Sequence, residues 1–205
     1  GYELWFERKW ATYVWDILIE VGERHGITPT GLVALDIARI EAGLLLIEVD
    51  FISARKARTE AQKSSPFELG LGWTVALSTK GDFIGKGALL REREAPSPWC
   101  LVGLEVSWEG IERAFEAAGL PPQVAGRASR ISVPIHNRLG NPVGRATSST
   151  FSPLLKKFIA LATVHRDHAT LGETLFYETV IEHRRCSLPA TVVETPFFDP
   201  PRKRA

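Results

Sequence analysis

The sequence predicts an α+β protein, in which a mostly helical first half is followed by a small antiparallel β-barrel or sandwich. Helical spacing of apolar residues is confined to the first half, and alternating runs rich in Val, Ile, Phe and Thr dominate the second half. The stretch "EAPSPW", with Pro96 and Pro98, has the composition of a linker between them. We therefore predict two domains, residues 1–95 and 97–205.

The first predicted element is a strand over the opening residues "GYELWFE". Strand side chains alternate between two faces, so Glu3 and Trp5 are expected on the same face. An edge strand with one solvated face accounts for this pattern from spacing alone. A carboxylate beside an indole also suits a ligand pocket, although Trp5 fits a core position equally well.

Two amphipathic helices are predicted next. Apolar residues recur at helical spacing over residues 9–23, beside a charged face. The second helix is predicted over residues 29–42, because Pro29 suits a first helical turn and Gly43 suits a C-terminal cap. The rest of this half is predicted as a charged surface loop, a buried strand, and a turn leading into a short helix, over residues 44–63, 72–77 and 81–94.

The second half is predicted to be mostly β-structure. A short helix is expected over residues 110–120, and a hairpin turn over residues 138–141. The predicted strands cover residues 99–107, 131–137, 142–149, 158–164, 174–182 and 187–198. Several short strands joined by turns are typical of a barrel or a sandwich.

Composition excludes several classes of function. The chain carries 25 Lys and Arg against 24 Asp and Glu, so its net charge of +1 predicts no nucleic-acid or membrane partner. Its two cysteines, Cys100 and Cys186, are expected as free thiols in a reducing, cytoplasmic compartment. The one histidine cluster, "HRDH" from His165 to His168, lacks a second ligand pair, which disfavours a metal site. No phosphate-binding glycine loop or nucleophile motif is present.

Four stretches, taken together, resemble the glycine cleavage system T protein (aminomethyltransferase) and its tetrahydrofolate-dependent relatives. They are "GYE", "GLVALDIARIEAGL" from Gly31, "SPFELGLGWTVAL" followed by "GDFIGKGALL", and "TSSTFSPLLKKFIALATV" from Thr147. The resemblance implies part of a folate-binding α/β body followed by a C-terminal antiparallel β-barrel. It also implies tetrahydrofolate as cofactor, and a small-molecule one-carbon donor or a lipoyl-carrier protein as partner.

The resemblance assigns a ligand role to Glu3, which matches the family glutamate that binds the pterin ring. One ionised carboxylate can accept hydrogen bonds from the adjacent N–H and amino groups of that ring. In the family, "GYE" lies well inside the protein and the catalytic aspartate precedes it. The chain is therefore expected to be a C-terminal part that contains no catalytic residue and is inactive alone. Its lack of any methionine agrees with this expectation.

Two departures from the family pattern, at Leu35 and at the C-terminal ending, bear on the activity, and a third concerns turns of the β domain. Leu35 replaces a second folate-binding arginine, and Arg39, one helical turn further on, is expected to pair with Asp36 instead. The ending "PFFDP" resembles the folate domains of sarcosine and dimethylglycine dehydrogenases. Ser149 and Lys156 stand where glycines are usual.

Aminomethyl transfer is the leading functional prediction, and two alternatives stay open. One is a folate-dependent demethylase of a methylated amine, sulfonium or aryl ether, which Leu35 and the ending favour. The other is a non-catalytic folate-binding protein, whose relatives carry a "KGCYxGQE"-type motif that is absent here.

Overall fold

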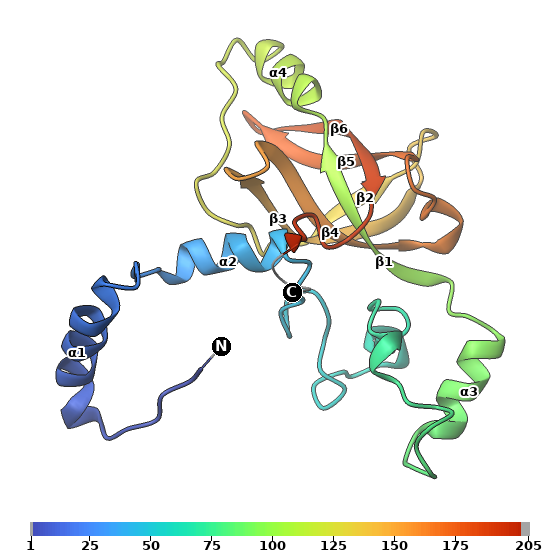
Figure 1. The fold of residues 1–205 in the computed structure, drawn as a ribbon. Helices are drawn as coiled ribbons and strands as arrows, with labels where there is room; N and C mark the ends of the chain where they lie inside the picture. The colour runs from blue at the N-terminus through green and yellow to red at the C-terminus, as the bar shows by residue number, and fades with distance from the viewer. Residues whose placement is uncertain (1, 202–205) are drawn as a thin grey trace. The chain divides into compact units, whose positions relative to one another are not determined.

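The computed structural model describes residues 2–201. The chain divides into two compact units between Leu32 and Val33. Figure 1 shows the elements of both along the chain. The predicted domain division between residues 95 and 97 stays a prediction. None of the described helices is long and apolar enough to cross a bilayer.

The first unit contains one predicted element that is correct and one that is wrong. A 3-10 turn, η1 (Arg8–Trp10), leads into α1 (Ala11–Glu23), which confirms the first predicted helix. The strand predicted over residues 1–7 is wrong for the described residues 2–7, which have no regular secondary structure. Tyr2 and Trp5 are 99% and 89% exposed there. Alternation alone does not make a strand, because the backbone groups of a strand need a neighbouring strand.

The second predicted helix is confirmed as α2 (Leu32–Glu41), which starts three residues later than expected. Gly43 ends it with φ +66°, a left-handed conformation that glycine adopts without strain. The Gly43 N–H donates to the Ile40 carbonyl and the Leu44 N–H donates to the Arg39 carbonyl. This is a Schellman cap, as the position of Gly43 predicts.

The segment between α2 and the barrel has little regular structure. It contains η2 (Glu60–Gln62), η3 (Gly72–Thr74) and the predicted short helix, α3 (Lys86–Glu94). The buried strand predicted over residues 72–77 is wrong, because no strand pairs with it and Trp73 is 84% exposed. Its backbone N–H groups bond locally instead. The Val75 N–H donates to the Gly72 carbonyl at 3.0 Å, three residues back along the chain, as in a 3-10 turn.

Six antiparallel strands form a closed barrel, as predicted. They are β1 (Trp99–Val106), β2 (Val133–His136), β3 (Pro142–Ser152), β4 (Lys157–His165), β5 (Thr174–Ile181) and β6 (Arg184–Val193). Their order around the barrel is β1-β4-β3-β2-β5-β6. Closure leaves no free sheet edge along the strands, and it decides between the predicted barrel and sandwich.

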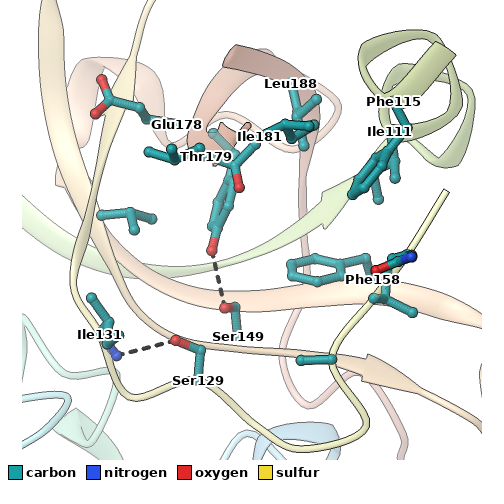
Figure 2. Close-up of a pocket in the computed structure, with 16 residues that line it drawn as sticks. Ile111, Phe115, Ser129, Ile131, Ser149, Phe158, Glu178, Thr179, Ile181 and Leu188 are labelled. Atoms are coloured by element: carbon teal, nitrogen blue, oxygen red, sulfur yellow. Dashed lines mark hydrogen bonds between the residues drawn. The ribbon is translucent and has the colours of Figure 1, made fainter. Parts of the chain in front are cut away.

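One end of the barrel carries α4 (Trp108–Glu116), which confirms the predicted short helix with an earlier start. Ser107 caps it, since its Oγ accepts a hydrogen bond from the Gly110 N–H at 3.1 Å. Ile111 and Phe115 pack against the barrel core. Residues 117–132, here called the α4–β2 connection, return from the helix to β2 and leave a pocket beside the barrel (Figure 2).

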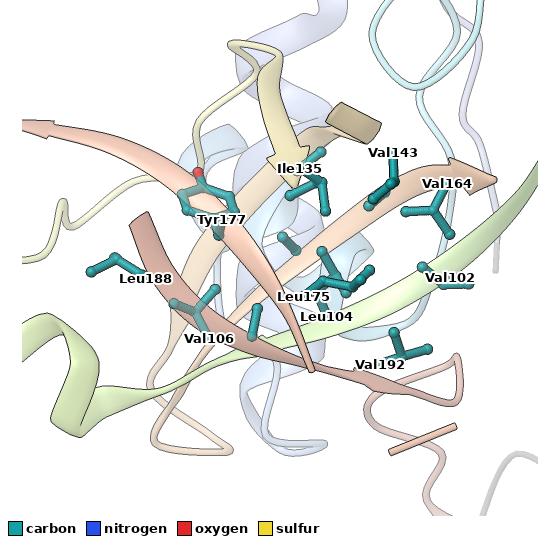
Figure 3. Close-up of a cluster of buried hydrophobic side chains, with 14 of the residues drawn as sticks. Val102, Leu104, Val106, Ile135, Val143, Val164, Leu175, Tyr177, Leu188 and Val192 are labelled. Atoms are coloured by element: carbon teal, nitrogen blue, oxygen red, sulfur yellow. The ribbon is translucent and has the colours of Figure 1, made fainter. Parts of the chain in front are cut away.

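The core fills the barrel interior with side chains from alternate strand positions. On β1, Val102, Leu104 and Val106 point inward, and Figure 3 shows them facing Leu175 and Val192 of other strands. Gly103 points to the opposite face, where a Cβ would lie 2.8 Å from the Phe197 ring. The close packing of Phe197 on β1 therefore requires glycine at this position.

Candidate functional site

The predicted ligand residue Glu3 lies in the irregular stretch before η1. Its side chain is exposed, and within residues 2–201 no hydrogen bond or ion pair engages its carboxylate. The carboxylate is therefore free to accept hydrogen bonds. Its role in folate binding stays a prediction.

The second predicted feature, Leu35, lies on the exposed side of α2 and is 56% exposed. Ile40, at the C-terminal end of this helix, is fully buried against Ile159 and Leu161 of β4. The helix thus docks on the outside of the barrel by its last turn. Leu35 adds an apolar side chain to the exposed surface and supplies neither charge nor hydrogen-bond donor.

The Arg39 guanidinium connects α2 to the rest of its unit. Its Nε donates to Asp36 Oδ1 at 2.9 Å, which confirms the predicted pair within the helix. Its Nη1 donates to Asp50 Oδ2 at 2.6 Å, and its Nη2 donates to Ser148 Oγ at 2.8 Å. The sequence interpretation of Arg39 as a structural residue fits this geometry, because each nitrogen has a protein partner.

Asp50 is the centre of this cluster, and its side chain is completely buried. Besides Arg39, its carboxylate accepts hydrogen bonds from the Leu46 N–H at 2.8 Å, Thr147 Oγ1 at 2.7 Å and Ser148 Oγ at 2.6 Å. Burying a charge is costly unless it is paired and hydrogen-bonded, and here both conditions hold. We call Asp36, Arg39, Asp50, Thr147 and Ser148 the α2–β3 polar network.

A β-bulge in β3 places the two hydroxyls beside Asp50. The register with β4 shifts between Ala146 and Ser148, so Thr147 is the extra residue. A bulge lets two successive side chains reach the same side of a sheet, which a regular strand does not allow. Thr147 and Ser148 can therefore both donate to one carboxylate oxygen.

Asp36 extends the network to the α4–β2 connection. Its second oxygen accepts a hydrogen bond from Arg130 Nε at 2.9 Å. Burial disfavours the charged form of Asp36, but the hydrogen bonds and charges of Arg39 and Arg130 outweigh it and lower the pKa of this carboxyl. The carboxylate thus stays ionised and joins two segments that are 94 residues apart.

A second polar contact fixes the end of α2. Glu41 is buried, and its Oε1 accepts a hydrogen bond from Ser152 Oγ of β3 at 2.5 Å. The Glu41 carbonyl accepts the Phe198 N–H at 2.8 Å. The carboxylates of Asp50 and Glu41 therefore hold α2 on the barrel through these hydrogen bonds.

The two histidines of the "HRDH" segment each lie beside a carboxylate. His165 Nδ1 lies 3.4 Å from Asp167 Oδ2, whereas His168 Nδ1 contacts Glu173 Oε1 at 2.8 Å. Across residues 2–201, no group of three or more His, Cys, Asp and Glu side chains has the arrangement of a metal site. Cys100 and Cys186 are both unpaired.

Comparison with known proteins identifies the family. The family model of the GCVT N-terminal domain matches residues 1–79, and that of the glycine cleavage T-protein C-terminal barrel domain matches residues 118–199. The chain belongs to the glycine cleavage T-protein family. The second match covers β2 to β6, and the first ends before α3.

Relatives of this glycine cleavage T-family chain include proteins with two different names. Trimethylamine-oxide aldolase of Ruegeria pomeroyi is 37% identical over 205 residues, which are all of this chain and 22% of the relative. The aminomethyltransferase of Symbiobacterium thermophilum is 34% identical over 204 residues, which are 100% of this chain and 46% of the relative. The chain thus spans about half the length of its aminomethyltransferase relatives and less of the aldolase.

A solved structure agrees on the fold. Glycine cleavage system aminomethyltransferase T from Bartonella henselae superposes with a TM-score of 0.67 over 92% of this chain and 44% of that protein, at 22% identity. At this identity the likeness concerns the fold alone. The α+β arrangement ending in a β-barrel is therefore a family feature.

Proposed function

We propose that the full-length protein transfers a one-carbon unit to tetrahydrofolate, with aminomethyl transfer as the leading reaction. The observation that carries this proposal is that the two family domains follow one another in order on one chain. A relative named aminomethyltransferase matches the whole chain at 34% identity. We place the reaction in the cytoplasm, in keeping with two cysteines that are unpaired in the structure.

Glu3 is the residue of this chain that we assign to the folate. Its chemistry fits the pterin, because a carboxylate accepts two adjacent N–H groups in a charge-assisted pair. The carboxylate is exposed and has no protein partner among the described residues, so no internal bond would need to break. The orientation that such a pair imposes is the contribution of Glu3 to the reaction.

The cofactor supplies the acceptor nitrogen, N5, for the one-carbon unit. The residues of this chain bind and position, and none of them is assigned a proton transfer. Within the second unit, the α2–β3 polar network fixes α2 on the barrel with a fully bonded buried carboxylate.

A second candidate function is a folate-dependent demethylase of a methylated amine or a related donor. Leu35 favours it, because the exposed face of α2 offers no guanidinium at the position where the glycine cleavage T protein has one. The 37% identity to a relative named trimethylamine-oxide aldolase also favours it. The two candidates differ in the donor: a lipoyl-carrier protein for aminomethyl transfer, and a small methylated molecule for demethylation.

Tetrahydrofolate titration of the full-length protein tests the common part of the proposal. The Glu3→Gln variant is expected to bind more weakly by about 1.5–3 kcal/mol, the range for hydrogen bonds to a charged group. Glu7→Gln is the matched control, because Glu7 is also exposed in the same stretch and its carboxylate pairs with Lys9. Equal affinities of Glu3→Gln and the unaltered protein would remove Glu3 from the site.

A donor assay then separates the two candidates. The full-length protein is incubated with tetrahydrofolate and either an aminomethylated lipoyl-carrier protein or trimethylamine N-oxide, and formation of the methylene derivative of the folate is measured. Turnover of only the carrier supports aminomethyl transfer, and turnover of only the amine oxide supports the second candidate. Folate binding without turnover of either donor contradicts aminomethyl transfer and demethylation of trimethylamine N-oxide, and supports the non-catalytic folate-binding alternative.

A further inference from the structure

The pocket at the α4 end of the barrel is a cavity of about 370 Å³. Its size lies within the range of small-molecule sites, about 300–1,000 Å³. Figure 2 shows side chains of α4, the strands and the α4–β2 connection around it. The apolar part of its wall includes Ile111, Phe115, Ile131, Val133, Phe158 and Leu188.

Two buried hydroxyls also line this pocket. Ser149 Oγ of β3 lies 3.0 Å from the Tyr177 hydroxyl of β5, the contact drawn at Ser149 in Figure 2. The two residues are 3% and 6% exposed. A pair of hydroxyls has two protons and uses one for its own hydrogen bond. Within the described residues neither hydroxyl has a further partner, so one O–H and several lone pairs remain available.

The hydroxyl pair is held in place and stays neutral. The Tyr177 ring packs edge-on against Phe158, with 5.8 Å between the ring centroids. Burial raises the pKa of Tyr177, and the Ser149 hydrogen bond offsets this only in part. Its hydroxyl therefore keeps its proton at neutral pH and can donate to a ligand.

The charge of the lining disfavours an anionic ligand, and its one carboxylate already has a counter-ion. Among the residues that line the pocket, Glu178 is the only charged one. Its Oε1 lies 3.9 Å from Arg185 Nε, and its side chain is 21% exposed. Among residues 2–201, no Lys, Arg or His lines the cavity, so an anion would lose its hydration without gaining a counter-charge there.

We infer that this pocket binds a small, uncharged organic molecule that carries one hydroxyl group. The apolar part of the ligand fills the cavity and packs against its aliphatic and aromatic side chains. Its hydroxyl completes the hydrogen bonds of Ser149 and Tyr177, which otherwise remain partly unsatisfied in a buried position. The site lies within the barrel unit, and this inference does not depend on the proposed folate function.

The test uses 4-ethylphenol and ethylbenzene as probes, because they differ by one hydroxyl. Each is titrated into the isotope-labelled 205-residue chain, and backbone amide shifts are followed by NMR. Saturable shifts for 4-ethylphenol in β5 and the α4–β2 connection are expected. Tyr177→Phe keeps the ring and removes the hydroxyl. It is expected to weaken the binding of 4-ethylphenol about 3–10-fold, which corresponds to one net hydrogen bond, and to change the affinity for ethylbenzene less than about twofold.

Two further variants complete the design. Ser149→Ala removes the other hydroxyl. It is expected to weaken the binding of 4-ethylphenol more than the binding of ethylbenzene, so the test stays decisive if Tyr177→Phe folds poorly. Tyr13→Phe is the matched control, because it removes the same group from a 61% exposed ring of α1. Absence of saturable binding, shifts confined to other regions, or equal weakening of both probes by Tyr177→Phe and Ser149→Ala would overturn the inference.

Discussion

Arg39 Nη1 on α2 lies 2.6 Å from Oδ2 of the buried Asp50, and this ion pair joins the helix to the loop that follows it. The same carboxylate also accepts the hydroxyls of Thr147 and Ser148 from β3. Because Arg39 is only 10% exposed and Asp50 is not exposed at all, loss of one partner leaves the other charge buried and unpaired. The pair therefore has a larger effect on stability than a surface ion pair.

Replacement of Arg39 by methionine is expected to lower the free energy of unfolding by about 3–5 kcal/mol. Methionine preserves much of the side-chain volume, so the loss reports the unpaired Asp50 carboxylate. Urea unfolding followed by circular dichroism measures it as a lower midpoint at unchanged slope.

Arg130→Met is the matched control for that change. Arg130 donates to Asp36 of the same network, but its side chain is 55% exposed. Exposed ion pairs contribute about 0–1 kcal/mol, so a small loss is expected. Equal losses for Arg39→Met and Arg130→Met would contradict the assignment of the buried pair as the main contact.

Because the pKa of Asp36 is lowered in the folded chain, the free energy of unfolding is expected to fall toward acidic pH. Since the carboxyl has a lower pKa in the folded than in the unfolded chain, its contribution is complete above the unfolded pKa and is lost as the pH falls through the folded pKa. Asp36→Asn is expected to lower stability at neutral pH and to flatten its decline toward acidic pH. Unfolding free energies measured from pH 7 to pH 3 test this, with the exposed Asp16→Asn of α1 as control. Parallel pH profiles for Asp36→Asn and the unaltered chain would argue against it.

Much of the fold follows from local sequence patterns. Periodicity and capping residues predict α1 and α2, and alternation predicts the six strands. The two strands predicted wrongly, over residues 1–7 and 72–77, show the limit of this reasoning. Alternation and apolar character show that a segment is compatible with a strand. A strand forms only where another strand pairs with it.

In the candidate site too, contacts between residues close in sequence could be predicted, whereas contacts between distant residues could not. The Arg39–Asp36 pair was predictable because three residues separate its members on a helix. The contact between Asp50 and Thr147 joins residues 97 positions apart and depends on a bulge in β3, for which the sequence carries no local signal. The prediction that Glu3 binds folate depends on the family resemblance and stays a prediction, since the spacing of Glu3 alone also fits a solvated edge strand.

Lys156 offers a stabilising substitution. It lies between β3 and β4 with φ +55°, a left-handed conformation that is costly for any residue with a Cβ. Glycine relieves about 1–2 kcal/mol of strain but loses more backbone entropy on folding, so Lys156→Gly is expected to stabilise by about 0.5–1 kcal/mol. Urea unfolding measures the gain. Lys157→Gly, within β4, is expected to destabilise, and the same sign for both variants would contradict the backbone explanation.

At Gly144 the replacement of glycine by alanine is expected to destabilise the chain, because β3 and β4 approach one another closely there. A Cβ at this position would lie 2.3 Å from the Thr163 carbonyl oxygen and 2.7 Å from the Val164 Cα. Both atoms belong to the backbone of β4, so the clash cannot be relieved by rotating a side chain. Gly144→Ala is therefore expected to lower the free energy of unfolding by about 2 kcal/mol or more, as in other overpacked sites.

Gly126→Ala is the control for Gly144→Ala, since a Cβ at Gly126 meets nothing within 4 Å. Residue 126 lies in the α4–β2 connection, outside the strands, so alanine is expected to change the unfolding free energy by less than about 0.5 kcal/mol. Thermal and urea unfolding of both variants distinguish the two sites. A Gly144→Ala protein as stable as Gly126→Ala would mean that β3 and β4 separate at little cost, which is incompatible with a barrel closed through that pair of strands.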